Sequence, residues 1–340
     1  MLPKILIVNT GGTFSMITDP ESHSLVNYDF KISMPSLQQL GVEINTYSFQ
    51  KQIDSSDMNP LYWIEIAKII EENYHLYDGF VVLHGTDTMA YTASALSFIF
   101  ENLQKPIILT GSQLPIGVVR SDGKDNLINS IEIAAAKDEN GNANVPEVCI
   151  CFKDKLYRGN RTTKLNAEGF DAFFSGNYPA LATIGAHIKY GKNDIQRVND
   201  GRKLCVHIKL ENKVGILKMH PGFSRKIVES ILGIEELEGL VLETYGNGNV
   251  PSFDWFEDAL RKAVERGLTI VNVTQCKMGG VEMGKYKASV KLLEAGVMSG
   301  FDMTTEAAVC KLMVVLGNAK NKNDIRKIMQ EPICGEMTLL

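Results

Sequence analysis

Short apolar runs alternate with longer amphipathic stretches along most of the chain. The apolar runs occupy residues 4–9, 80–83 and 106–110. Continuous runs of β-branched and aliphatic residues are typical of parallel strands that are buried on both faces. The amphipathic stretches, with apolar residues at helical spacing, occupy residues 60–74, 88–103 and 125–137. This order favours an α/β fold with a mostly parallel, flavodoxin- or Rossmann-like sheet that is flanked by helices.

The alternation of strands and helices weakens after Cys151 and resumes near residue 212. The polar, glycine-containing segment before residue 212 is typical of a linker. A chain of 340 residues is too long to fold around one ordinary hydrophobic core, so two domains are expected. We predict a larger N-terminal domain at 1–190, a linker at 191–211 and a smaller C-terminal α/β domain at 212–340. Further helices are predicted at residues 253–266, 288–296 and 305–316.

Composition excludes several classes of protein. The net charge of −5 gives no basic face for nucleic acid, and no apolar run approaches the about 20 residues that span a bilayer. No secretory leader is evident, and the six cysteines are scattered, so we expect a cytoplasmic, reduced protein. Cys149 and Cys151 alternate within one strand-like run, which predicts core packing on one sheet face. No ligand spacing indicates a metal site, and no cofactor is expected.

Three of the predicted strands end in glycine and hydroxyl residues. The segments are TGGT at 10–13, HGTDT at 84–88 and TGS at 110–112. In open α/β sheets, ligands bind beyond the carboxyl ends of the strands. These joins therefore predict a small polar site that is rich in hydroxyl groups.

Each join has a functional and a local structural interpretation. Thr13 follows paired glycines and could attack a bound ligand, or it could cap a turn. Asp87 could hold an ammonium group while the helix start attracts a carboxylate, or it could be an N-cap. Ser55 and Ser56 precede the first long helix and have the same two alternatives. Lys164 is a surface lysine unless it is buried near Asp87, where it could act as a base.

Taken in order, these segments resemble the L-asparaginase family, specifically its cytosolic type I branch. The resemblance covers nearly the whole chain, and TGGT followed by HGTDT is specific to the family. The segments that carry it are TGGT, DSSDM, HGTDTM, LTGSQLP, LYRGNRTTK, TYGNGN and QCKMGGVEMGKY.

The resemblance implies roles for individual residues. Thr13 would be the nucleophile that attacks the side-chain amide of the substrate. Thr86, Asp87 and Lys164 would form a second catalytic group, in which the lysine assists proton transfer through Thr86. The order in which the two threonines act stays open. The implied substrate-binding residues are Ser55, Ser56, Gly85, Thr86, Asp87, Ser112 and Asn249.

The family also implies an oligomer whose sites lie at protomer interfaces. Asn249, and more weakly Glu282, match positions that complete a neighbouring protomer's site. We therefore expect a homodimer or homotetramer.

Two departures from the family pattern stand out. Family members often have a tyrosine in the loop after TGGT. Here Leu25 lies near that position, and Tyr28 follows three residues later. Some type I members carry a regulatory asparagine site near positions matching Thr163 and Cys276. The arginine expected in its wall is Glu243 here, so weak or absent activation by asparagine is expected.

The predicted activity is conversion of L-asparagine and water to L-aspartate and ammonia. L-Glutamine, one methylene longer, is expected as a minor substrate because a methylene is worth only ~1–3 kcal/mol in a pocket. The main alternative is a catalytically silent amino-acid sensor on the same scaffold. A transfer-RNA amidotransferase subunit would carry an additional amino-terminal domain, and a nucleotide-binding protein would need a glycine-rich phosphate loop.

Overall fold

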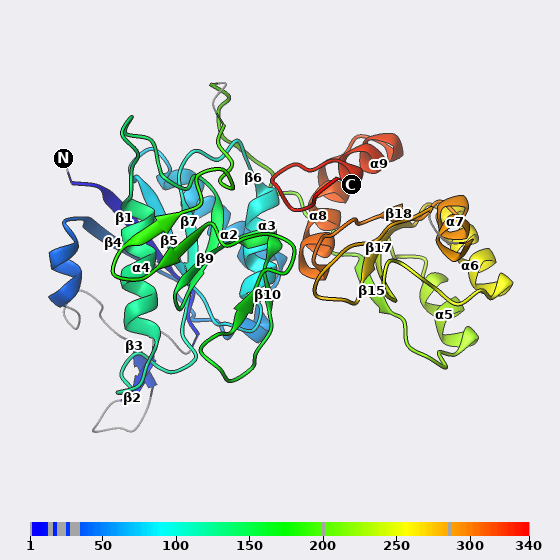
Figure 1. Cartoon of the computed structure of the whole chain (residues 1–340), viewed down its shortest axis with the longest axis horizontal. Coiled ribbons are helices and arrows are strands. Elements are labelled where there is room, and N and C mark those ends of the chain that lie inside the picture. Colours follow the sequence, from blue (N-terminus) through cyan, green and yellow to red (C-terminus); the bar gives the residue numbers. More distant parts are fainter. Residues whose placement is uncertain are drawn as a thin grey trace. The chain divides into compact units, whose positions relative to one another are not determined.

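The computed structural model describes residues 2–12, 16–18, 25–27, 35–198, 201–284 and 287–339. Only the backbone is described for residues 16–18, 25–27, 35, 36, 38, 287 and 288. The chain divides into two compact units, Met1–Val206 and His207–Leu340 (Figure 1). No helix within the described ranges is long and apolar enough to cross a membrane.

The first unit is built on a mostly parallel sheet. Its strands are β1 (Lys4–Asn9), β4 (Glu43–Ser48), β5 (Gly79–Leu83), β7 (Ile107–Thr110), β8 (Val148–Phe152), β9 (Lys155–Arg158), β12 (Ala182–Ile184) and β13 (Ile188–Tyr190). Across the described residues, the strand order is β13-β12-β9-β8-β7-β5-β1-β4. The strands from β8 to β4 pair in parallel, whereas β9, β12 and β13 pair antiparallel. The predicted fold class is confirmed.

Consecutive residues along the central strands are buried. Since neighbouring residues of a strand point to opposite faces, both faces of this sheet are covered by helices. The helices are α2 (Pro60–Asn73), α3 (Met89–Ile99) and α4 (Gly123–Ala135). Leu127 and Ile131 of α4 pack in one core cluster with Ile5 and Ile7 of β1. All three predicted helices are confirmed, with small differences at their ends.

Helix α3 ends four residues before its predicted end at 103. The residues that follow, β6 (Phe100–Glu101), pair antiparallel with β14 (Cys205–Val206). Asn102 then takes a left-handed conformation with φ of 61°. Pairing with a distant strand thus overrides the local helical pattern.

Short elements connect the main ones. They are the antiparallel pairs β2 (Met16–Thr18) with β3 (Leu25–Asn27) and β10 (Thr163–Lys164) with β11 (Phe173–Phe174), and the 3-10 turns η2 (Pro35–Leu40), η3 (Ser55–Asp57) and η4 (Gly159–Arg161).

Cys149 and Cys151 are fully buried in the core cluster beside α4, as predicted. Burial raises the pKa of the Cys151 thiol to about 12 and also raises that of Cys149. Both thiols are therefore neutral and inert at neutral pH.

The second unit has its own parallel sheet and core. The strands β15 (Val214–Lys218), β16 (Gly239–Thr244), β17 (Thr269–Thr274) and β18 (Met298–Ser299) pair in that order. The helices are α5 (Arg225–Leu232), α6 (Asp254–Arg266), α7 (Lys287–Glu294), α8 (Thr305–Asn318) and α9 (Lys322–Gln330). Helix α8 lies on one face of the sheet, and α5, α6 and α7 lie on the other (Figure 1). Helices α5 and α9 were not predicted from the sequence.

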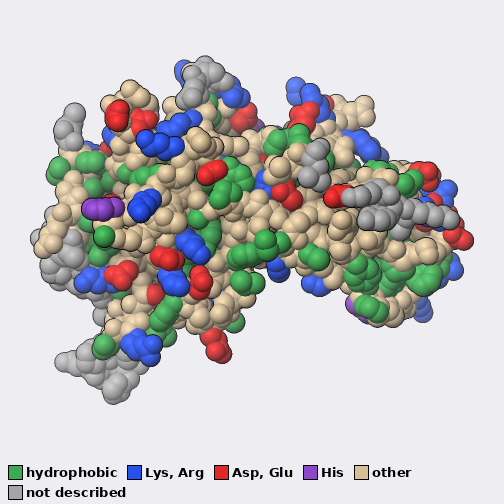
Figure 2. All heavy atoms as spheres, viewed as in Figure 1, with side chains coloured by type: hydrophobic (Ala, Val, Ile, Leu, Met, Phe, Trp, Pro, Cys, Tyr) green, Lys and Arg blue, Asp and Glu red, His purple; other side chains and the backbone are tan. Residues whose placement is uncertain are grey.

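Lysine and arginine side chains are interspersed with aspartate and glutamate on the face seen in Figure 2. This mixture agrees with the small net charge of −5.

Candidate functional site

The predicted joins of the first unit meet at the carboxyl edge of its parallel strands. The Thr10 hydroxyl, directly after β1, donates to the carbonyl of Leu83 in β5 at 2.8 Å. The His84 N–H donates to the Thr110 carbonyl at the end of β7 at 2.9 Å. Gly12 has a φ of 82°, and a Cβ there would lie only 2.8 Å from the Gly85 nitrogen. Glycine is therefore required where the first two joins touch.

Lys164, Thr86 and Asp87 come together at this edge. The Lys164 Nζ lies 2.9 Å from the Thr86 Oγ1 and 2.6 Å from the Asp87 Oδ1. The Lys164 side chain is only 16% exposed, whereas that of Asp87 is 66% exposed. Lys164 is therefore held inside the cluster, and Asp87 keeps a face toward solvent where a ligand could approach.

Gln113 is a further member of the cluster that was not predicted from the sequence. The Thr86 hydroxyl donates to the Gln113 Oε1 at 3.1 Å. The Gln113 Nε2 donates to the carbonyls of Gly169 at 3.0 Å and Ala167 at 3.3 Å. Its position directly after Ser112, at the end of the third join, is the one feature of the sequence that could have indicated a place in the site.

The two serines before α2 point in different directions. Ser55 is buried, and a Cβ on Gly85 would lie 2.5 Å from its Oγ. Its carbonyl accepts a hydrogen bond from the Thr88 hydroxyl at 2.6 Å. Ser56 is exposed, and its hydroxyl donates to Asp54 at 2.9 Å. Ser55 therefore belongs to the same edge as Gly85, whereas the Ser56 hydroxyl is engaged in a local turn.

The start of α3 has no side-chain cap. Thr88 is the N-cap residue, yet its side chain makes no capping hydrogen bond because its hydroxyl is directed to Ser55. Ser112, which follows β7, is buried, and its hydroxyl has no hydrogen-bond partner among the described residues. The start of a helix attracts anionic ligand groups.

The His84 side chain links the HGTD loop to helix α3. Its Nδ1 lies 2.6 Å from the Gly85 carbonyl, and its Nε2 lies 2.8 Å from the Thr92 hydroxyl. Trp63 donates its indole N–H to the same hydroxyl at 3.0 Å. Burial lowers the pKa of His84 to about 4, so the ring is neutral at neutral pH.

A buried ion pair anchors the segment that carries Lys164. The Arg158 Nε lies 2.6 Å from the Glu147 Oε2, and both side chains are at most 8% exposed. The Arg158 guanidinium also lies over the Tyr178 ring at 4.2 Å. The chain is therefore fixed just before β10, which delivers Lys164.

Asn249 and Glu282 lie in the second unit, near one another. Asn249 and Tyr245 exchange two backbone hydrogen bonds at 2.8 and 3.0 Å, which closes a tight turn. The Glu282 N–H donates to the carbonyl of Asn247 within that turn at 3.1 Å.

Glu243, where the family pattern predicts an arginine, also lies in the second unit. Its carboxylate lies 3.2 Å from the Lys218 Nζ and accepts a hydrogen bond from the Thr305 hydroxyl. Cys276 is exposed, and Thr163 lies in the first unit.

Thr13 and Tyr28 lie outside the described residues, and Leu25 is described only in its backbone. The nucleophile role and the loop departure therefore remain predictions.

Comparison with known proteins identifies the family. The sequence matches the asparaginase N-terminal domain at residues 4–196 and the glutaminase/asparaginase C-terminal domain at residues 213–329. The chain belongs to the asparaginase family.

Relatives from this family align along nearly the whole chain. L-asparaginase 1 of Escherichia coli is 41% identical, and the match covers 98% of each protein. The 60 kDa lysophospholipase of mouse is 42% identical over 96% of this chain, which spans 57% of the length of that relative. The crystal structure of L-asparaginase I from Vibrio cholerae superposes with a TM-score of 0.90 at 40% identity and full coverage of both chains.

Proposed function

We propose that this asparaginase-family protein hydrolyses L-asparagine to L-aspartate and ammonia as a type I enzyme. The observation that carries the proposal is the contact of Lys164 with both Thr86 and Asp87 at the carboxyl edge of a parallel sheet. The similarity to proteins named L-asparaginase supports the substrate.

The reaction proceeds through an acyl-enzyme. The Thr13 hydroxyl adds to the side-chain amide carbon, and the carbon–nitrogen bond breaks as the nitrogen takes up the proton that Thr13 has lost, so that ammonia leaves. Water then hydrolyses the ester and releases aspartate. A threonine hydroxyl is weakly acidic, so it needs a base. Lys164, once neutral, takes a proton through the hydroxyl of Thr86, and the order in which the two threonines act stays open.

Fixed charges of the substrate meet complementary groups. Asp87 holds the α-ammonium group, and Ser55 with the uncapped start of α3 holds the α-carboxylate. Backbone N–H groups of Gly85 and Thr86 stabilise the oxyanion, which is a large term in acyl transfer. The Ser112 carbonyl accepts a hydrogen bond from the side-chain amide of the substrate, and Ser56 contributes to the outer margin of the substrate site. L-Glutamine is a weaker substrate, and no metal or cofactor takes part.

The active form is a homodimer or homotetramer in the cytoplasm. In this proposal, the domain at 1–190 carries the catalytic residues and the segment at 191–211 is the linker. The domain at 212–340 contributes Asn249 and Glu282 to the site of a neighbouring protomer. A monomer isolated at low concentration that kept full turnover would contradict this assignment.

Ammonia release from asparagine and from glutamine tests the proposed activity. Thr86→Val should lower kcat by at least about 100-fold, because proton transfer through a positioned group contributes this much. Thr13→Ala should do the same. Thr110→Val is a matched control, since its buried hydroxyl only donates to the Cys151 carbonyl at 2.8 Å. Wild-type protein that binds asparagine without releasing ammonia would instead indicate a sensor.

A further inference from the structure

We propose that Gln113 is a positioning residue that fixes the hydroxyl of Thr86 and ties it to the loop between β10 and β11. The inference rests on the proposed function, because it requires Thr86 to take part in the reaction. It concerns a side chain that comes from a third segment of the chain, distinct from those that carry Thr86 and Lys164.

Hydrogen bonding determines which way the Gln113 amide points. One end of the amide faces the carbonyl oxygens of Gly169 at 3.0 Å and Ala167 at 3.3 Å. Carbonyl oxygens only accept hydrogen bonds, so this end must be the NH₂ group. The other end, facing Thr86, is therefore the oxygen.

The same reasoning sets the direction of the Thr86 hydroxyl. A charged Lys164 can only donate, so the Thr86 Oγ1 accepts from its Nζ at 2.9 Å. The single hydroxyl proton is then left for the Gln113 Oε1, which lies 3.1 Å away. Hydrogen bonds to two different partners select one of the three staggered positions of the threonine side chain. Gln113 thus keeps the Oγ1 within reach of Lys164. Once Lys164 is neutral, the hydroxyl proton turns from the Gln113 Oε1 to the Lys164 Nζ before it is transferred.

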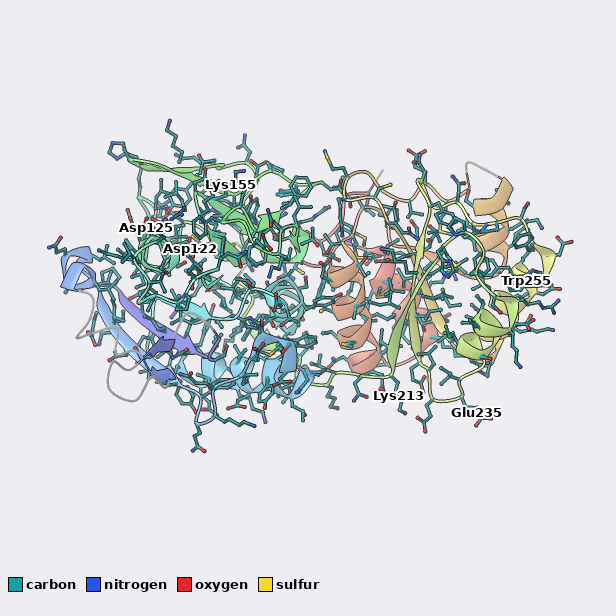
Figure 3. All side chains as sticks on the ribbon, turned by 90° about the horizontal axis from the view of Figure 1, so that it is seen from below. Asp122, Asp125, Lys155, Lys213, Glu235 and Trp255 are labelled. Atoms are coloured by element: carbon teal, nitrogen blue, oxygen red, sulfur yellow. The ribbon has the colours of Figure 1, made fainter. Side chains whose placement is uncertain are left out.

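Gln113 is itself held firmly by α4. Its N–H donates to the carboxylate oxygens of Asp122 at 3.0 and 3.2 Å. Asp122, labelled in Figure 3, also accepts from the side chain of Asn126 at 3.1 Å. Asn126 in turn donates to the Gly111 carbonyl at 2.9 Å. The start of α4 therefore fixes the backbone from which the Gln113 side chain extends.

The test compares ammonia release from asparagine by Gln113→Met, Gln113→Asn and Gln113→Glu. Methionine has no group that holds the hydroxyl, and asparagine is one methylene too short to reach it. For both variants we expect kcat to fall about fivefold to tenfold, since one hydrogen bond is lost. KM should change by less than about twofold, because Gln113 acts through Thr86 and not on the substrate. Gln113→Glu keeps an oxygen toward Thr86 but sets its second oxygen against the carbonyls of Gly169 and Ala167, so this variant should lose kcat as well.

Asn166→Ala is the matched control for the loop. The Asn166 Oδ1 accepts from the backbone N–H groups of Glu168 and Gly169, both at 2.9 Å. The substitution removes two hydrogen bonds within the same loop and leaves the side chain of Gln113, and the two carbonyl groups that it contacts, unchanged. We expect this variant to keep the wild-type kcat.

Three outcomes would overturn the inference while leaving the proposed function standing. They are a wild-type kcat in both Gln113→Met and Gln113→Asn, an equal loss of kcat in Asn166→Ala, and a rise of KM without a fall of kcat. Wild-type protein that releases no ammonia from asparagine would instead overturn the proposed function itself. Thermal unfolding of each variant identifies losses that arise from misfolding, and Gln113→Asn serves if Gln113→Met does not fold.

Discussion

Acidification should destabilise the first unit because His84 cannot accept a proton without losing a hydrogen bond. The Trp63 indole N–H only donates and the Gly85 carbonyl only accepts, so the chain of hydrogen bonds has one direction. The His84 Nδ1 carries the hydrogen, and its Nε2 accepts from the Thr92 hydroxyl at 2.8 Å. A proton on Nε2 would place a charged ring in a fully buried environment and would remove the acceptor of the Thr92 hydroxyl.

The magnitude follows from the pKa of His84. The pKa falls from 6.5 in the unfolded chain to about 4 in the folded protein, chiefly because of burial. At 1.36 kcal/mol per pH unit, this difference corresponds to about 3 kcal/mol. Above pH 6.5 both states are neutral, and the histidine contributes no pH dependence. As the pH falls from 6.5 toward about 4, only the unfolded state binds the proton, and stability is lost over that window.

Tryptophan fluorescence can isolate this unit. The chain has two tryptophans, and Trp255, labelled in Figure 3, lies in the second unit. In a Trp255→Phe background, emission from the buried Trp63 reports unfolding of the first unit alone. The free energy of unfolding is measured with urea at several pH values. His84→Asn is the matched variant, because its amide nitrogen takes the position of Nδ1 and does not titrate.

The expected result is a steeper loss of stability in the histidine protein. Between about pH 7 and about pH 4 it should lose about 3 kcal/mol more than the His84→Asn variant. Carboxylates titrate in both proteins, so their contribution cancels in the comparison. Parallel pH dependences of the two proteins would refute the reasoning, whatever their absolute stabilities.

Two further predictions concern the second unit. Lys311 and Glu336 form a fully buried ion pair at 2.6 Å. Lys311→Met should lower the free energy of unfolding by about 3–5 kcal/mol, whereas removing the exposed Arg225 should cost less than about 1 kcal/mol; equal effects in urea unfolding would contradict this. The Glu243 carboxylate lies beside Lys218, whose largely exposed side chain offsets its repulsion of a ligand carboxylate poorly. Ammonia release should therefore follow a hyperbolic dependence on asparagine concentration, and a sigmoidal curve would show the expectation to be wrong.

Local patterns predicted much of the fold. The central strands are continuous apolar runs because both faces are buried, and the structure has them as β1, β5 and β7. Helix α2 begins at Pro60 with Asn59 as its N-cap, which is a start signal carried by neighbouring residues. Shorter elements escaped prediction when their formation depends on partners far away in sequence. The pairing of β6 with β14, which ends α3, is an example.

The sequence by itself determined which segments carry polar groups at the ends of strands, since the strand pattern and the glycine turns are local. It could not determine which of those groups touch. Lys164 lies 78 residues from Thr86 along the chain, and Gln113 lies 27 residues from Thr86. Their contact depends on the order of strands in the sheet. It also depends on the Arg158–Glu147 ion pair before β10 and on the start of α4, which holds Gln113. Those are properties of the packed unit, so only the tertiary structure decided that Thr86 stands between a lysine and a glutamine.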